Sequence, residues 1–253
     1  MTNYAQETKL SLKTKIGLNG KCIIEDTFFT PPLKLMSPFY EDDTANIMLI
    51  SVSAGLMEGD HQEMDFDIGQ DCKVKLTSQS FEKIHNTQKG FASRNTQIKI
   101  ANNATFDFSP LPIIPFANSD FRGSTTIYLK TNSNLIYSEI ITAGRTSRDE
   151  IFAFKNFSSK LKIYKENKPI FFDNTLLDPK TIELNNVCLF DNYTHYLNLI
   201  IIGNQIPQEY LKETIIKSNL NIGISELQTG GFCIKALSKN SEDLLFLREK
   251  IAK

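Results

Sequence analysis

The chain has 253 residues, a formal net charge of -1 and 23% charged residues. This balance excludes the basic surface that binds a phosphate backbone, so nucleic acid is not an expected partner. No membrane span is expected, because the longest aliphatic run, 199–202, is far shorter than the roughly 20 residues that cross a bilayer. The start lacks an apolar signal region, and four scattered cysteines without a C-x-x-C pair favour a reducing, cytoplasmic location.

The first part of the chain has the pattern of short strands. Residues 10–16 alternate between apolar and polar, which predicts a half-buried strand. Asn19-Gly20 predicts a type I′ turn, with 22–24 as the return strand. Residues 30–35 contain two prolines and predict an extended edge segment.

Residues 53–83 combine a glycine-rich turn, two alternating runs and a polar strip. The turn carries Gly55, Gly59 and Asp60, and the runs 64–68 and 74–76 predict two strands. The strip consists of Thr77, Ser78, Gln79, Ser80 and Lys83. We expect it where a strand runs out toward solvent.

Short strands continue through the middle of the chain. They are predicted at 95–100, 104–108, 124–130, 135–142, 150–154, 161–164 and 170–172. Turn signals recur about every ten residues, a spacing typical of an all-β stack, sandwich or β-helix-like fold.

Two helices are predicted near the C-terminus, at about 207–219 and 241–252, with a hairpin around 229–231 between them. Pro207 suits a first helical position, and Leu211, Ile215 and Ile216 form the apolar face of the first helix.

The second helix is predicted to use Ser241 as its N-cap. Its apolar stripe, which includes Leu244, Leu245 and Leu247, either packs on the protein core or receives a partner, and core packing is favoured.

Catalytic motifs are missing from the sequence. It has no phosphate-binding loop, no dinucleotide fingerprint and no nucleophile elbow. The three histidines have no metal-binding spacing. We therefore expect a protein that is not an enzyme.

Three groups of residues have both a functional and a structural interpretation. The turn with Gly55, Gly59 and Asp60 would let a partner approach, or would simply connect two strands. The strip would bind a partner or guide an ion, or would satisfy its own hydrogen bonds. Arg145 and Glu150 would form a structural ion pair across a turn, or would line a polar channel.

The order and spacing of these pieces resemble the urease accessory protein family UreD/UreH, and most of all its UreH-type members. The matching pieces are Pro32-Leu33-Lys34, Gly55 with Gly59-Asp60, Thr77 with Lys83, Leu111-Pro112 with Ile114, Gly144-Arg145 with Glu150 and Phe152, Gly230-Gly231-Phe232 and Lys235-Ala236-Leu237. Ser53-Ala54-Gly55 departs from the Gly-Gly found in many relatives.

The resemblance implies a mainly β, β-helix-like stack with two helices, forming a single domain over residues 1–253. It implies a cytoplasmic scaffold between apo-urease and a complex of UreF with the GTPase UreG. UreF would bind directly, UreG through UreF, in a two-plus-two assembly of this chain with UreF. GTP would belong to UreG, no cofactor would be tightly bound, and nickel would pass transiently, with an internal polar tunnel as its route.

On this hypothesis the candidates for the nickel path or partner contacts are Gly55, Gly59, Asp60, Thr77, Ser78, Gln79, Lys83, Arg145 and Glu150. An alternative is a metal-assisted hydrolase in which Asp60, His61 and Glu150 meet in one pocket. These three are also the weak metal-ligand candidates. A third possibility is a structural stack whose polar strip docks a partner helix.

Overall fold

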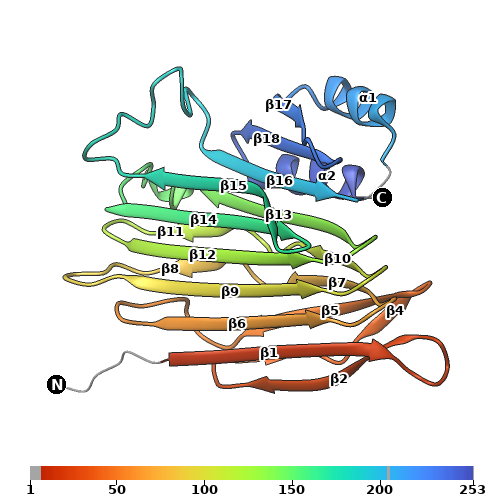
Figure 1. Ribbon diagram of the computed structural model, residues 1–253. Helices are drawn as coiled ribbons and strands as arrows, with labels where there is room; N and C mark the ends of the chain where they lie inside the picture. Colours follow the sequence, from red (N-terminus) through yellow and green to blue (C-terminus); the bar gives the residue numbers. More distant parts are fainter. Residues whose placement is uncertain (1–6, 204–205, 253) are drawn as a thin grey trace.

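The computed structural model describes residues 7–203 and 206–252. Two sheets face each other, and the chain passes repeatedly from one to the other in a solenoid-like stack of about four turns (Figure 1). This confirms the predicted mainly β, β-helix-like fold with two helices near the C-terminus. No helix within the described ranges is long and apolar enough to cross a membrane.

Sheet A has the order β15-β14-β12-β9-β6-β1-β2. The strands β1, β6, β9, β12 and β14 pair in parallel, and the outermost strands β2 and β15 pair antiparallel. Their bounds are β1 (Glu7–Ile16), β2 (Cys22–Phe29), β6 (His61–Ile68), β9 (Ala92–Ile100), β12 (Asp120–Leu129), β14 (Asn156–Lys165) and β15 (Lys168–Leu177).

Sheet B has the main order β17-β18-β16-β13-β10-β7-β5-β3, with the short strands β4, β8 and β11 beside it. The bounds are β3 (Leu33–Leu35), β4 (Phe39–Glu41), β5 (Thr44–Ser51), β7 (Lys73–Ser78), β8 (Glu82–Ile84), β10 (Thr105–Phe108), β11 (Ile113–Pro115), β13 (Asn134–Thr142), β16 (His195–Ile202), β17 (Asn221–Glu226) and β18 (Phe232–Ser238). The predicted edge segment at 30–35 thus contains the edge strand β3.

Alternation along each strand determines which side chains fill the space between the sheets. In β6, Gln62, Met64, Phe66 and Ile68 are buried, and the residues between them are partly exposed. Phe66 meets the ring of Phe106 from sheet B at a centroid distance of 5.9 Å. The core therefore forms by interleaving the inner faces of two sheets.

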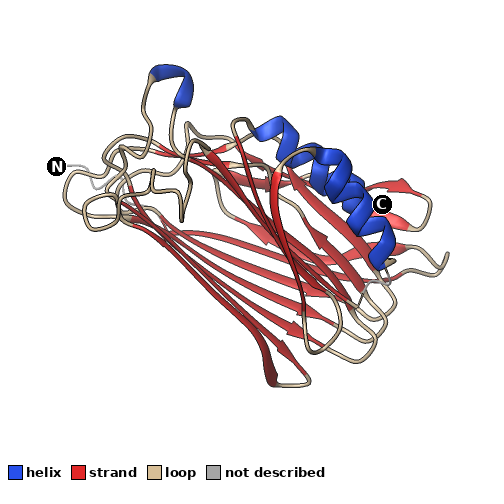
Figure 2. Cartoon of the chain, turned by 90° about the horizontal axis from the view of Figure 1, so that it is seen from above, coloured by secondary structure: helices blue, strands red, loops and turns tan. Residues whose placement is uncertain are grey.

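The helices α1 (Gln208–Ser218) and α2 (Ser241–Ile251) pack on the outer face of sheet B (Figure 2). Leu244 and Leu247 of α2 are fully buried there, which confirms the favoured interpretation of the apolar stripe. The N-cap prediction was wrong by one residue, because the side chain of Asn240, rather than Ser241, accepts the bond from the Asp243 N–H.

Three further local predictions differ from the structure. Residues 150–154 form no strand: they follow a short 3-10 helix, η1 (Thr146–Arg148), and Phe152 has a positive φ. The β1–β2 turn is not type I′, because only Gly20 of the Asn19-Gly20 pair has a positive φ. On α1, Ile216 is exposed and Thr214 takes the buried position beside Leu211.

Candidate functional site: a polar interior between the sheets

The space between the sheets contains a band of polar side chains between two apolar clusters of the core, one that includes Phe66 and one that includes Phe157. The first connection across it is an ion pair between Arg94 on β9 of sheet A and Glu82 on β8 of sheet B, at 2.5 Å. The Nε of Arg94 also donates to Oε1 of Gln62 at 2.7 Å. Both charged side chains are only 17% exposed, so each depends on the other for solvation.

A second connection joins β14 to β13. The hydroxyl of Ser159 donates to Oε2 of Glu139 at 2.9 Å. Burial raises the pKa of Glu139 to about 7, although the Ser159 hydrogen bond and the charge of Arg94 act in the opposite direction. Glu139 is therefore poised to gain or lose a proton near neutral pH.

A third connection joins β15 to β16 and β18. Asp173 accepts from Nδ2 of Asn198 at 2.8 Å and from Nζ of Lys235 at 3.0 Å. The Oδ1 atom of Asn198 is buried and has no hydrogen-bond partner. A buried polar atom without a partner is uncommon and costly, so it marks a place suited to a polar occupant.

The three connections form one row, here named the interior polar series. Glu139 is the register partner of Asn198, which is in turn the register partner of Lys235, so the three lie side by side on one face of sheet B. The charges of both Arg94 and Asp173 act on the Glu139 carboxyl. The members of the series are Gln62, Arg94, Glu82, Ser159, Glu139, Asn198, Asp173 and Lys235.

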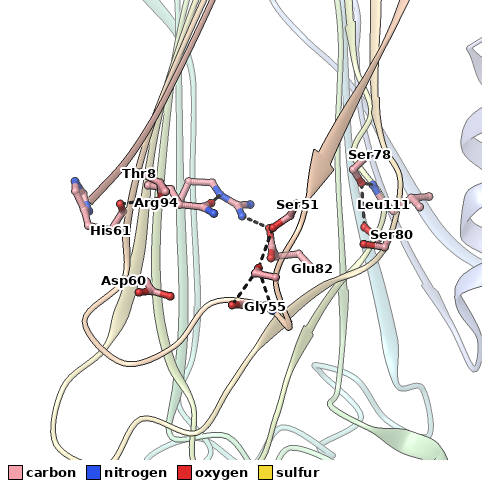
Figure 3. Close-up of polar contacts among 12 residues, drawn as sticks. Thr8, Ser51, Gly55, Asp60, His61, Ser78, Ser80, Glu82, Arg94 and Leu111 are labelled. Atoms are coloured by element: carbon pink, nitrogen blue, oxygen red, sulfur yellow. Dashed lines mark hydrogen bonds and ion pairs between the residues drawn. The ribbon is translucent and has the colours of Figure 1, made fainter. Parts of the chain in front are cut away.

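Two hollows lie beside the start of this series. An interior cavity of about 70 Å³ is lined by Arg94, Glu82, Glu139 and Ser159, among others. This volume is enough for several water molecules. A separate open groove of about 550 Å³ is lined by Gln62, which accepts the hydrogen bond from Arg94 in the lining of the cavity. Figure 3 shows Arg94 reaching from its strand toward Glu82 and Ser51.

The predicted turn lies in the open groove, where Gly55 and Asp60 are among the lining residues. A carboxylate oxygen of Asp60 accepts from the Met57 N–H at 2.8 Å and so closes the turn. Gly55 has a φ of 132°, and a Cβ there would lie 2.3 Å from the carbonyl oxygen of Lys83. Gly59 also has a positive φ and donates its N–H to the Phe91 carbonyl.

The polar strip is not a single wall, because neighbouring strand residues point to opposite faces. Of its members, Ser78 and Ser80 line the cavity, and Ser78 accepts from the Leu111 N–H at 2.9 Å. Thr77 is not among the residues lining the cavity, and the backbone N–H of Gln79 bonds to the Leu49 carbonyl. The Lys83 side chain is exposed, and its carbonyl accepts from the Leu56 N–H.

Arg145 and Glu150 form the predicted ion pair across the turn, and Nε of Arg145 donates to Oε2 of Glu150 at 2.7 Å. The guanidinium holds the pKa of Glu150 below its usual range. It also lies 4.2 Å from the centre of the Phe116 ring. Arg145 lines a separate surface groove beside the start of α2, so this pair is not in the cavity that Ser78 lines.

The structure does not bring Asp60, His61 and Glu150 together. His61 bonds instead to Ser93 and Glu63, and Figure 3 shows it pointing away from Arg94. Within residues 7–203 and 206–252, no three His, Cys, Asp or Glu side chains gather as metal ligands. The metal site proposed for the alternative hydrolase is therefore wrong.

The sequence analysis missed the members of the interior polar series. A usable signal was present: Glu139 is the one charged residue in the mostly apolar run 135–141, and Asn198 is the one polar residue in 197–202. A single polar residue within a buried strand needs a partner, and that requirement points to a polar interior. Arg94 and Glu82 gave no such signal, because Arg94 lies among polar residues and Glu82 lies in a mixed polar and apolar stretch.

Comparison with known proteins identifies the family. Residues 6–252 match the family described as UreD urease accessory protein. The chain belongs to the UreD family of urease accessory proteins. It is 55% identical to urease accessory protein UreH of Helicobacter acinonychis, across 100% of this chain and 97% of that protein. It is 52% identical to UreH of Helicobacter hepaticus, across all of both chains, and 34% identical to urease accessory protein UreD of Acetivibrio thermocellus, across 95% and 94%. Membership of this family implies a role in urease maturation.

Proposed function

We propose that this UreD-family chain is a cytoplasmic, non-catalytic scaffold that connects apo-urease to a UreF–UreG complex and conducts nickel during GTP-dependent insertion. UreF would bind it directly and UreG through UreF, in a two-plus-two assembly with UreF. GTP hydrolysis would be the work of UreG. Family membership and the accessory-protein names of the relatives support the scaffold role.

The interior polar series carries the conduit part of the proposal. It begins at Gln62 in the open groove, continues through the Arg94–Glu82 pair and Glu139, and reaches Lys235, whose side chain is 42% exposed. Polar groups in an otherwise apolar interior are costly, and a passing cation would explain their presence. The partnerless Oδ1 of Asn198 would accept a hydrogen bond from the ion's hydration water.

The chemistry of the series suits transfer better than storage. Each carboxylate of the series already has a partner within the protein. The three pairs are Glu82 with Arg94, Glu139 with Ser159, and Asp173 with Lys235. No cluster of three metal-ligand side chains lies among the described residues. A conduit must bind its ion weakly enough to release it, and carboxylates spaced along a path meet that condition.

The test compares urease activation with UreF binding for Glu139→Leu, which removes the only carboxylate of the second connection. The proposal expects activation of apo-urease by UreF, UreG, GTP and nickel to fall at least about tenfold. Binding to UreF on a sizing column should stay as in the wild type. Glu41→Leu, at an exposed position of β4, is the matched control and should activate normally.

Two results would contradict the proposal. Failure of the wild-type chain to co-elute with UreF would remove the scaffold role. Full activation by a folded Glu139→Leu variant would remove the conduit role through this cavity. Equal loss of activation and UreF binding, with a lowered melting temperature, would show that Glu139 serves stability instead.

A further inference from the structure

The strand β15 forms one open edge of sheet A, at the opposite end of the sheet from β2 (Figure 1). It pairs with β14 along one side. Within residues 7–203 and 206–252, no backbone hydrogen bond joins β15 to any other segment. An edge strand of this kind presents unpaired N–H and C=O groups with which a further strand can pair.

The two edges of sheet A differ in how they are protected against such pairing. The strand β2 carries Glu25, which forms ion pairs with two lysines of β1. Along 170–177 of β15 the one charged side chain is Asp173, which lies on the inner face and is already paired with Lys235. Charged side chains on an edge strand discourage pairing with another chain, so β2 is protected and 170–177 is not.

The outward face of β15 carries a row of exposed apolar side chains. Phe172 and Leu176 are 62% and 49% exposed, and Asn174 lies between them on the same face. Side chains of an added strand would lie directly beside this row, at the close spacing of cross-strand neighbours. The row therefore favours apolar side chains next to Phe172 and Leu176.

A groove follows the inner face of the same strand. Its volume is about 410 Å³, and it is lined by residues of β15 and by residues of β17, the edge strand of sheet B. Thr175 and Leu177 contribute to it from β15, and Leu189 and Phe190 from the loop that follows. The inward side chains of an added strand would enter this groove.

Two lysines lie behind the apolar row. Lys162 and Lys160 of β14 are exposed and are the register partners of Phe172 and Asn174. Neither lysine forms an ion pair with any described residue. The strand β14 carries no acidic residue, and the one in β15 is Asp173 on the inner face. By charge complementarity, this surface suits an acidic partner.

We propose that the open edge of β15 binds an extended, acidic segment of a partner protein, which pairs with it as a further strand of sheet A. The outward side chains of this segment are apolar, acidic and apolar in turn, with the acidic one beside Asn174. Strands lie about 4.8 Å apart, so the acidic residue is about 10 Å from the Lys160 backbone, a distance that the two side chains bridge together.

A second copy of this chain fits the surface less well than an acidic segment. Its own β15 would bring the outward side chains Phe172, Asn174 and Leu176, and its single acidic residue, Asp173, is turned inward and paired. The lysines of β14 would then still lack a partner. The proposal requires only a partner with this chemistry, and it does not depend on the nickel path.

The first test titrates the full chain into a fluorescently labelled synthetic peptide and follows anisotropy. In the peptide, valine, glutamate and valine occupy alternate positions, with threonine between them. We expect binding that weakens as the salt concentration rises. A peptide with lysine in place of the glutamate should bind at least about tenfold more weakly. No binding of the glutamate peptide, or equal binding of the two peptides, would overturn the proposal.

Hydrogen exchange then locates the bound peptide. Strand addition gives the free amides of β15 a hydrogen-bond partner, so exchange should slow in 170–177 and stay unchanged in β2. Protection that leaves 170–177 unchanged would overturn the proposal. Slower exchange in 170–177 as the concentration of the chain alone rises, together with a dimer on a sizing column, would also overturn it, because a second copy would then be the occupant.

Variants test the two parts of the surface separately. Phe172→Asp should weaken binding of the glutamate peptide at least about tenfold, because it places a negative charge in the apolar row. Phe28→Asp is the matched control, since Phe28 is 55% exposed on β2 at the other edge of the sheet, and it should bind as the wild type does.

Lys160→Glu should reverse the preference, so that the lysine peptide binds more tightly than the glutamate peptide. Lys212→Glu, at an exposed position of α1, should leave the preference unchanged. Melting temperatures show which variants are folded, and a reversed preference cannot result from a loss of folding. Wild-type binding by folded Phe172→Asp, or an unchanged preference in Lys160→Glu, would overturn the proposal.

Discussion

Arg94 and Glu82 form an ion pair that connects the two sheets across the interior of the stack. Arg94 belongs to sheet A and Glu82 to sheet B, and both side chains are largely removed from solvent. Removing either partner leaves the other charge poorly solvated, and this cost exceeds that of losing a surface pair.

Arg94→Met tests this relationship. We expect a loss of roughly 2–3 kcal/mol in the free energy of unfolding, because Glu82 and Gln62 lose their shared partner. Urea denaturation monitored by circular dichroism measures it. Lys130→Met, which breaks the exposed pair with Glu166, should cost less than about 1 kcal/mol. Equal losses in the two variants would contradict the interior role of Arg94.

Glu139 should make stability depend on pH. Its folded pKa of about 7 lies above the ordinary carboxyl value, so the folded state holds a proton that the unfolded state has released. The corresponding stability is fully present below about pH 4.5 and is lost as the pH rises through 7. The lost stability amounts to roughly 3 kcal/mol if the full shift is realised.

Glu139→Gln removes this titration while keeping the size of the side chain. As the pH rises from 4.5 to 8, the wild type should lose this stability and the variant should not. The difference in the free energy of unfolding between the variant and the wild type should therefore shift in favour of the variant by roughly 3 kcal/mol. Urea unfolding of both proteins at the two pH values gives the difference. A difference that stays constant with pH would mean that Glu139 remains ionised in the folded chain.

Gly55 should not tolerate a side chain. Alanine would place its Cβ 2.3 Å from the Lys83 carbonyl oxygen at a φ of 132°, so the turn would have to move. We expect Gly55→Ala to cost roughly 2–4 kcal/mol in thermal or urea unfolding.

Gly223→Ala is the matched control for that experiment. A Cβ at Gly223 meets nothing within 4 Å, and the residue lies within β17. The change should be neutral or stabilise the protein by about 0.5 kcal/mol. A loss at Gly223 as large as that at Gly55 would show that steric contact is not the cause.

Arg248 should anchor α2 to sheet B. It is 4% exposed, and Nη1 donates to the carbonyls of Ser109 and Pro110 at 3.3 and 3.4 Å. Arg248→Met should cost roughly 2 kcal/mol, because the buried Ser109 carbonyl and the partly buried Pro110 carbonyl lose their donor. Lys250→Met, at an exposed position of the same helix, should stay within about 0.5 kcal/mol of the wild type. Hydrogen exchange on α2 provides a local readout.

The sequence alone determined the local features of this protein. Alternation in 64–68 placed Phe66 on a buried face, and the Gly55 turn and the Arg145–Glu150 pair followed from nearby residues. Each feature depends on residues only a few positions apart in the sequence. At that distance the two-residue repeat of a strand and the conformational preferences of turn residues determine the local structure.

Only the tertiary structure decided which polar side chains meet. Glu139 and Ser159 come from different sheets, and Ser93 meets His61 because β6 and β9, about 30 residues apart, pair in a particular register. The period of a strand defines its two faces but does not determine which one faces inward when both carry polar residues. That choice, and the register, come from packing every turn of the stack on its neighbours.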